Sequence, residues 1–200
     1  MKKIIYTFFV FSILLSSCVQ DVDDVFDEPS SVRVEKALAE YQTLLKSAEY
    51  GWAMEYYPSS TQAYGGYLFT MKFKDGDQVT VSTDAFEEAE KEVTSLYSLK
   101  KDIGPTLNFD TYNELFHHFS DPDIIDGGGK GKGYEGDYEF IFRSHTDNEI
   151  ILRGKKTNNV IKMTRLTEPP MTLLDKTVKL SKETFTTTYT ASIGGKTFVV

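Results

Sequence analysis

Apolar and polar residues alternate with a period of two along much of this chain. In residues 67–74 the apolar face carries Tyr67, Phe69, Met71 and Phe73. This period is typical of a β-strand with one buried face, because successive side chains point to opposite sides of a sheet. Asp75-Gly76 separates the run from residues 79–83, and such a pair favours a tight hairpin turn. The pattern predicts antiparallel hairpins.

The same pattern recurs in the second half of the chain. Residues 139–143 and 149–153 alternate on either side of Thr146-Asp147-Asn148, and residues 160–166 alternate after Asn158-Asn159. Polar turn residues between alternating runs indicate further hairpins.

The C-terminal residues predict one more hairpin, around Gly194-Gly195. Its first strand falls in residues 185–193 and its second in residues 197–200, which end on Phe198-Val199-Val200. Chains more often end in a polar, frayed segment. Two interpretations therefore stay open: the final strand belongs to the sheet, or the chain is the front part of a longer protein.

Two segments change to helical spacing. From residue 31, apolar residues recur every three or four positions, at Val34, Leu38, Tyr41, Leu45 and Ala48. This helix is expected to stop at Gly51, since glycine adopts the left-handed cap conformation at no steric cost. Residues 111–120 predict a second short helix, begun by the capping box Thr111-x-x-Glu114. Its expected buried face carries Tyr112, Leu115, Phe116 and Phe119.

These elements predict the fold class. Helix, strands, short helix and more strands, joined by loops of hairpin length, favour an antiparallel sheet with helices on one face or end. The expected fold is α+β: a meander-like or partly closed β-sheet with an N-terminal amphipathic helix and a second short helix.

The first 18 residues resemble the leader of an exported lipoprotein. Lys2 and Lys3 precede the apolar run Ile4–Leu15, and small residues follow before Cys18. The apolar stretch is shorter than the ~20 residues that a membrane-spanning helix needs. Leu15-Ser16-Ser17-Cys18 resembles the bacterial lipobox, which implies cleavage after residue 17 and lipid, including palmitate, on Cys18.

Cys18 is the only cysteine of the chain. No disulfide can therefore form within the mature protein, although its expected compartment permits them. Stability must come from burial of apolar side chains.

Residues 18–31 form an acidic segment with one proline and no apolar face, which is typical of a solvated tether. An acidic run after the lipidated cysteine also resembles the signal that sends lipoproteins of the Bacteroidota to the outer face of the outer membrane. A plain charged linker is the alternative. The expected organisation is a signal peptide at 1–17, a tether at 18–31 and one α+β domain at 32–200, with its C-terminus possibly incomplete.

The charge balance argues against nucleic acid as a partner. The formal net charge is −8, and loss of Lys2 and Lys3 with the leader makes it more negative. Nucleic-acid binding depends on cationic side chains that release counterions.

No motif singles out a catalytic residue. Gly131–Gly136 has the letters of a dinucleotide fingerprint, but a strand rather than a helix is expected to follow it. No serine lies in a glycine-flanked elbow, and Cys18 is the lipid acceptor. We therefore do not expect an enzyme, although a hydrolase with carboxylates that sequence spacing does not reveal stays open.

Asp121, Asp123 and Asp126 are the candidate metal ligands, with Asp137 nearby in sequence. Carboxylates on a flexible turn are typical calcium ligands, but Lys132 stands where a calcium loop that starts at Asp121 needs its bidentate acid. Adjacent His117 and His118 point about 100° apart on a helix, which disfavours zinc. No resident cofactor is expected, and calcium is kept as a candidate.

Aromatic residues are the remaining feature, and several fall between residues 50 and 67. Tyrosine suits partly wet recognition surfaces because it combines an apolar ring with a polar tip. Trp52 and Tyr56 share a strand face and are expected in the core. Tyr57 and Tyr64, with the loop at residues 58–66, are the candidate ligand-binding residues.

The order of these motifs resembles an uncharacterised lipoprotein family of the Bacteroidota, domain of unknown function 4302. The resemblance rests on Glu49-Tyr50-Gly51-Trp52, Asp110-Thr111-Tyr112, residues 136–140 and residues 151–158. Members are generally longer than this chain and are often encoded near outer-membrane nutrient-uptake systems. The resemblance implies a transporter complex and a polymeric nutrient as partners, and it brings no catalytic or binding residue.

We therefore expect an outer-membrane lipoprotein, anchored on the cell-surface or periplasmic face. Its expected function is that of a non-catalytic module that binds a glycan or peptide for nutrient uptake. A structural or adhesive surface subunit and a hydrolase are the alternatives.

Overall fold

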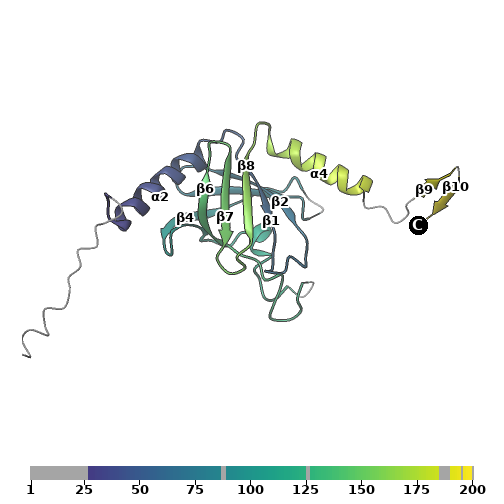
Figure 1. Cartoon of the computed structure of the whole chain (residues 1–200), viewed down its shortest axis with the longest axis horizontal. Helices are drawn as coiled ribbons and strands as arrows, with labels where there is room; N and C mark the ends of the chain where they lie inside the picture. Colours follow the sequence, from purple (N-terminus) through teal and green to yellow (C-terminus); the bar gives the residue numbers. More distant parts are fainter. Residues whose placement is uncertain (1–26, 87–88, 125–126, 185–189, 195, 200) are drawn as a thin grey trace, which may run out of the picture. The chain divides into compact units, whose positions relative to one another are not determined.

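The computed structural model describes residues 27–86, 89–124, 127–184, 190–194 and 196–199 (Figure 1). Within the last two segments, exposure is described only for Gly194 and Lys196. The lipidation candidate Cys18 and the metal candidate Asp126 lie outside the described residues.

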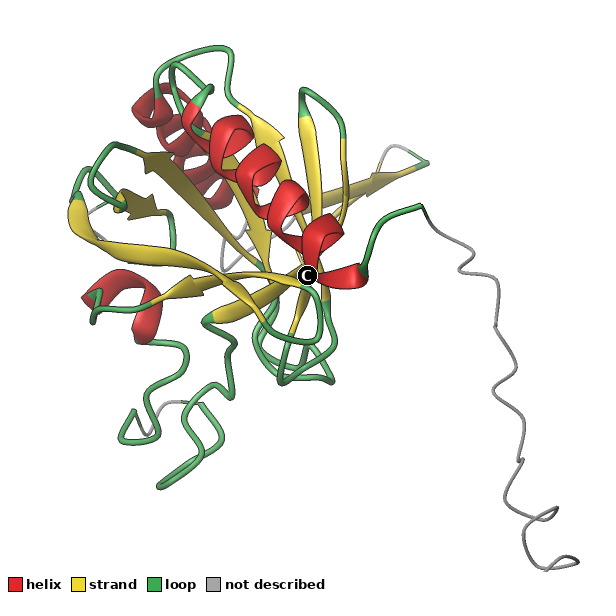
Figure 2. Cartoon of the chain, turned by 90° about the vertical axis from the view of Figure 1, so that its left-hand side faces the viewer, coloured by secondary structure: helices red, strands yellow, loops and turns green. Residues whose placement is uncertain are grey.

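Eight antiparallel strands form a closed barrel. They are β1 (Trp52–Tyr56), β2 (Tyr67–Phe73), β3 (Gln78–Thr83), β4 (Val93–Lys101), β5 (Pro105–Phe109), β6 (Glu139–His145), β7 (Glu149–Gly154) and β8 (Val160–Arg165). Each strand pairs with the next, and β8 returns to pair with β1, with Trp52 opposite Arg165. Figure 2 shows the strands in yellow, curving round to enclose one core.

The antiparallel sheet with helices is thus confirmed, and its strands follow one another as the expected meander. The sheet is, however, fully closed, and the alternative of a partly closed sheet is wrong. Closure depends on the β1–β8 pairing, which joins residues more than a hundred positions apart. The two-residue alternation reports only that each strand has a buried face. It does not reveal which strands meet.

The interior of the barrel is filled by large side chains. An eight-stranded barrel is just wide enough for its inward residues to pack against one another or to hold one small ligand. Here the inward positions carry bulky residues with at most 3% of their surface exposed: Trp52, Met54, Tyr56, Phe69, Met71, Phe73, Tyr97, Leu107, Phe109 and Phe140. Any ligand would therefore have to contact the outside of the barrel or its ends.

Helix α2 (Ser30–Lys46) packs against one end of the barrel. The Tyr41 ring stacks on Phe142 with centroids 3.8 Å apart, and Leu45 is fully buried. The Trp52 indole N–H donates a hydrogen bond to the Leu45 carbonyl at 3.0 Å. These contacts tie the helix to the first strand of the sheet.

Helix α2 ends at Lys46, so the prediction that it stops at Gly51 is wrong. Gly51 lies instead directly before β1, in a conformation that other residues rarely adopt. Its φ is +86°, and a Cβ at this position would lie 2.4 Å from the Met71 carbonyl oxygen. We expect Gly51→Val to lower the free energy of unfolding in chemical denaturation, because both the left-handed backbone and the contact with β2 penalise a side chain.

Gly65 separates the two causes. Its φ is +78°, but no atom lies within 4 Å of an added Cβ. Gly65→Val should lose only about 1–2 kcal/mol from backbone strain. Gly51→Val should lose a further 1–3 kcal/mol or so from overpacking. Equal losses would show that Met71 does not crowd this position.

A second long helix, α4 (Pro170–Thr184), follows the barrel and was not predicted. Leu174 is its buried residue. Beyond it, β9 (Thr190–Ile193) and β10 (Lys196–Val199) pair antiparallel around Gly194, at the turn that the sequence predicts. None of the helices described in the structure has the length and apolar character needed to cross a membrane.

Candidate binding site at the α3 end of the barrel

The short helix α3 (Glu114–His117) lies at the end where β1, β3, β5 and β7 finish, which we name the α3 end. Its N-cap is Asn113, whose side-chain oxygen accepts hydrogen bonds from the Leu115 and Phe116 N–H groups at 3.1 and 3.2 Å. The predicted capping box is therefore wrong. The Thr111 hydroxyl instead accepts the Leu96 N–H at 2.8 Å and fixes β4.

Phe116 fastens α3 to the barrel. Its buried ring lies 4.3 Å from Phe109, 5.3 Å from Phe69 and 5.4 Å from Tyr56, measured between centroids. The Asn113 amide adds a second attachment, since it donates hydrogen bonds to the Val93 carbonyl and the Ser95 hydroxyl at 3.2 Å. The helix is held by both apolar packing and polar contacts.

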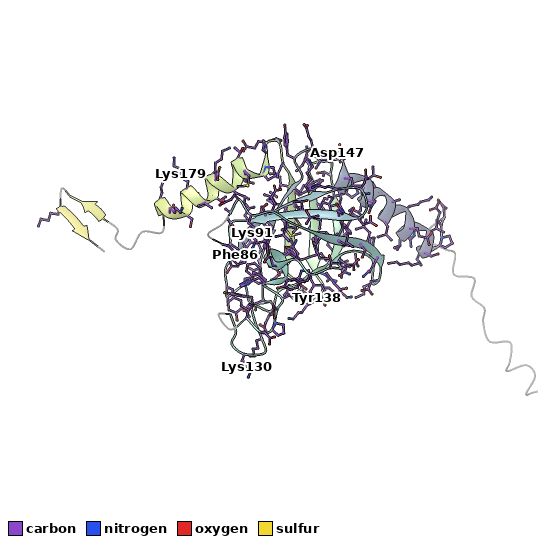
Figure 3. The ribbon with its side chains drawn as sticks, turned by 180° about the vertical axis from the view of Figure 1, so that it is seen from behind. Phe86, Lys91, Lys130, Tyr138, Asp147 and Lys179 are labelled. Carbon is purple, nitrogen blue, oxygen red and sulfur yellow. The ribbon has the colours of Figure 1, made fainter. Side chains whose placement is uncertain are left out.

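Three aromatic side chains from different elements meet beside α3. The His117 ring lies 5.5 Å from Tyr112 and 5.7 Å from Tyr138, and it is tilted by 31° from each. Tyr112 is 67% exposed and Tyr138 is 44% exposed. We name these three residues the exposed aromatic row. Figure 3 shows Tyr138 toward the same end of the molecule as Lys130, away from Asp147.

His117 is neutral at the centre of this row. Its Nδ1 accepts the Asn113 N–H at 3.0 Å, which orients the imidazole. Burial lowers the pKa of His117 below its ordinary value, although hydrogen bonds with backbone groups act to raise the pKa. A neutral ring between two tyrosines offers a flat surface without a fixed charge.

Tyr138 also forms one wall of a hollow of about 250 Å³ on the outer face of the barrel. Its lining residues are Gly136, Asp137, Tyr138, Glu139, Lys155 and Lys156. Lys155 lies 2.6 Å from Asp102 and 3.1 Å from Glu139. Hydrogen bonds with these carboxylates raise the pKa of Lys155, and the bond with Lys155 lowers the pKa of Asp102. Charged groups therefore stand beside the aromatic row.

Asp137 makes the floor of this hollow rigid. Its buried carboxylate accepts hydrogen bonds from the N–H groups of Lys156 and Thr157 and from the Thr157 hydroxyl. Its backbone carbonyl accepts the Tyr56 hydroxyl at 3.0 Å. The β7–β8 turn and the start of β6 are thus fixed to one another, and Tyr138 lies on a fixed part of the chain.

The structure places Tyr57 and Tyr64 in half-buried positions. A Cβ on Gly66 would lie 2.5 Å from the Tyr57 ring, so that ring packs against the loop backbone. The Tyr64 ring meets Tyr134 edge-on at 5.2 Å. Neither tyrosine belongs to the exposed aromatic row, and the structure does not bring the two candidate residues together with it.

The metal candidates lie on a loop of the α3 end. The Asp121 carboxylate accepts the Asp123 N–H at 2.9 Å, which stabilises the turn, and the Asp123 side chain is exposed. Asp126 is outside the described residues. Within the described ranges, no three His, Cys, Asp or Glu side chains are grouped so that they could hold a metal ion. Asp137 binds the β7–β8 turn instead.

The exposed aromatic row was missed at the sequence level. Tyr112 was expected on the buried face of a helix that starts at Thr111, but α3 starts only at Glu114 and leaves Tyr112 outside it. The Asn113 side chain is the signal that could have found this, because asparagine is among the preferred N-caps. No local sequence pattern marks Tyr138, because its contact with His117 joins residues that are distant in the sequence.

Fold and site together define a class of protein: a closed, eight-stranded antiparallel barrel with a filled interior and an aromatic surface at one end. The chain belongs to the family described as a domain of unknown function, DUF4302, which it matches over residues 22–198. Neither a curated protein nor a solved structure shows significant similarity to it.

Proposed function

We propose that this chain is a lipid-anchored, non-catalytic binding module that holds a polymeric nutrient, a glycan or a peptide, on the exposed aromatic row. The proposal places it in the outer membrane of a member of the Bacteroidota, beside a transporter complex that takes up the ligand. Its leader is residues 1–17, its lipid acceptor is Cys18, and the acidic tether at 18–31 carries the barrel.

The observation that carries this proposal is the row of Tyr112, His117 and Tyr138. Large aromatic rings rarely stay exposed together unless they contact a partner, and tyrosine is enriched at recognition sites. The tilt of 31° between neighbouring rings keeps them close to parallel. A row of this kind suits an extended polymer, because successive units can each lie against one ring.

The surroundings of the row support binding rather than catalysis. Asp137 and Phe116 hold its supporting chain segments in place, and a rigid site loses little conformational entropy when a ligand binds. Asp102 and Glu139 are already paired with Lys155, which lines the hollow beside Tyr138. They suit hydrogen bonds to ligand hydroxyl or amide groups. No cofactor enters the proposal.

The double variant Tyr112→Ala/Tyr138→Ala should lose binding while its unfolding midpoint stays nearly unchanged. Each ring is exposed, so truncation removes little buried surface, whereas anchor residues of a binding surface often contribute about 2 kcal/mol or more. The purified full chain is screened on glycan arrays and peptide libraries, and the affinity for each hit is then measured for both proteins.

Ile103→Ala is the matched control. Ile103 is 77% exposed and apolar, but it lies in the β4–β5 turn and outside the row. It should leave affinity unchanged. Equal affinity of the double variant and the original chain for a confirmed ligand would refute the row as the binding site.

A further inference from the structure

A second hollow lies between α4 and the segment that follows β3, and it has a different chemistry from the exposed aromatic row. Its volume is about 580 Å³, within the range of small-molecule sites. Its lining comes from two elements: Asp84, Ala85 and Phe86 after β3, and Thr177, Val178, Ser181 and Lys182 of α4. Leu174, fully buried, anchors the helix that forms one wall.

Asp84 is the negative group of this hollow. Its carboxylate accepts the Leu68 N–H at 3.0 Å, which fixes one oxygen. Burial raises the pKa of Asp84 above its ordinary value, although hydrogen bonds with the Leu68 N–H, the Thr177 side chain and its own backbone act in the opposite direction. A half-buried carboxylate with free acceptor capacity is stabilised by a cationic donor that enters the hollow.

Lys182 is the positive group. The other two lysines of α4 have acidic partners, since Lys176 lies 2.6 Å from Glu168 and Lys179 lies 3.9 Å from Glu183. Among the described residues no carboxylate lies within ion-pair distance of Lys182, and Asp84 is therefore not its partner. Among the described residues that line the hollow, Asp84 and Lys182 thus supply one charge of each sign, and neither has an ion-pair partner there.

The remaining wall is apolar. Phe86 meets the edge of the His118 ring at 5.0 Å, which holds its position, and Ala85 and Val178 complete the surface. Figure 3 shows Phe86 on the barrel and Lys179 on the neighbouring helix α4. The aliphatic side chain of a ligand can lie against this wall while the charged groups of the same ligand reach the polar residues of the hollow.

We propose that this hollow binds a small zwitterion, an amino acid or a short peptide, whose ammonium group contacts Asp84 and whose carboxylate contacts Lys182. The Asp84 carboxylate would repel a simple anion, and the Lys182 ammonium would repel a simple cation. Only a ligand with both charges satisfies both groups. This site is separate from the proposed polymer site and does not depend on it.

Titration calorimetry of the purified full chain tests the proposal with three probes: leucyl-leucine, its N-acetyl derivative and its C-terminal amide. Leucyl-leucine should bind, and each derivative should bind about tenfold more weakly or worse, because each lacks one charge-assisted contact. Binding of either derivative as tightly as leucyl-leucine, or no binding of leucyl-leucine at millimolar concentration, would overturn the proposal.

Two variants assign the contacts. Lys182→Ala should weaken leucyl-leucine binding by about tenfold or more, and Lys179→Ala on the same helix should leave it unchanged. Asp84→Asn keeps an acceptor for the Leu68 N–H and should weaken binding similarly. Tyr112→Ala/Tyr138→Ala should have no effect here, so a loss in that variant would place the peptide on the aromatic row and exclude this hollow. An unchanged affinity in Lys182→Ala would also exclude it.

Discussion

Cys18→Ala is expected to move the protein from the membrane fraction to the soluble fraction and to abolish its labelling by a palmitate analogue. Cys18 is the only thiol in the chain, so no other residue can accept the diacylglycerol group. Each buried methylene of an acyl chain contributes about 0.8 kcal/mol to membrane binding, and two or three chains give stable anchoring. Under the proposed lipidation, Cys18→Ala removes all of these chains at once.

Ser16→Ala is the control for this experiment, because it keeps Cys18 and a small residue in the proposed lipobox. It should retain both the label and the membrane fraction. Label that persists in Cys18→Ala, or a mutant that still sediments with membranes, would contradict the lipid anchor. Protease treatment of whole cells then distinguishes the cell-surface face from the periplasmic face.

The hairpins were the most predictable part of the fold. Asp75-Gly76 marks the β2–β3 turn, and Gly76 adopts a φ of +71° there, as such a turn requires. The turns at residues 146–148 and 158–159 likewise join β6 to β7 and β7 to β8. Turn chemistry is local, so it can be read from a few neighbouring residues.

Strands β4 and β5 were not predicted, because apolar and polar residues do not alternate regularly along them. Ser95 is polar but buried, whereas Leu96 is apolar and 43% exposed. Strand β5 begins with Pro105 and carries the buried amide Asn108. A pattern that assigns polar residues to the surface wrongly predicts that Ser95 and Asn108 are exposed.

The site could be predicted less well than the fold. The exposed aromatic row combines a residue before α3, one in α3 and one at the start of β6, and no periodicity relates these positions. The sequence did indicate that His117 and His118 point apart, and the structure agrees: His117 faces Tyr112, whereas His118 faces Phe86 and Tyr134. Helical geometry is local, but the neighbours of each ring depend on long-range packing.

Both proposed sites depend on the same structural principle. Because large side chains fill the barrel, its wall acts as a rigid support, and the segments that close or follow it carry the chemistry. Tyr112 and His117 belong to the segment that includes α3, while Lys182 belongs to α4. Substitutions in these segments should change recognition with little effect on the barrel, unless they remove an anchor.

Phe116 is such an anchor, and Phe116→Ala is expected to lower the free energy of unfolding by about 3–5 kcal/mol, as measured by chemical denaturation. The ring is fully buried, and alanine would leave a cavity among Tyr56, Phe69, Phe109 and Phe140. These four side chains come from the strands β1, β2, β5 and β6, whose pairing opposes collapse into that space. The lost burial and the residual cavity therefore both contribute to the loss.

Tyr112→Ala is the matched control, since it removes an aromatic ring four residues away that is 67% exposed. Its unfolding free energy should change by less than about 0.5 kcal/mol, as is usual for surface positions. A loss below about 1 kcal/mol in Phe116→Ala would mean that α3 is not part of the cooperative core. In that case the exposed aromatic row would lack its rigid support, and the preorganisation that favours binding at this end of the barrel would be lost with it.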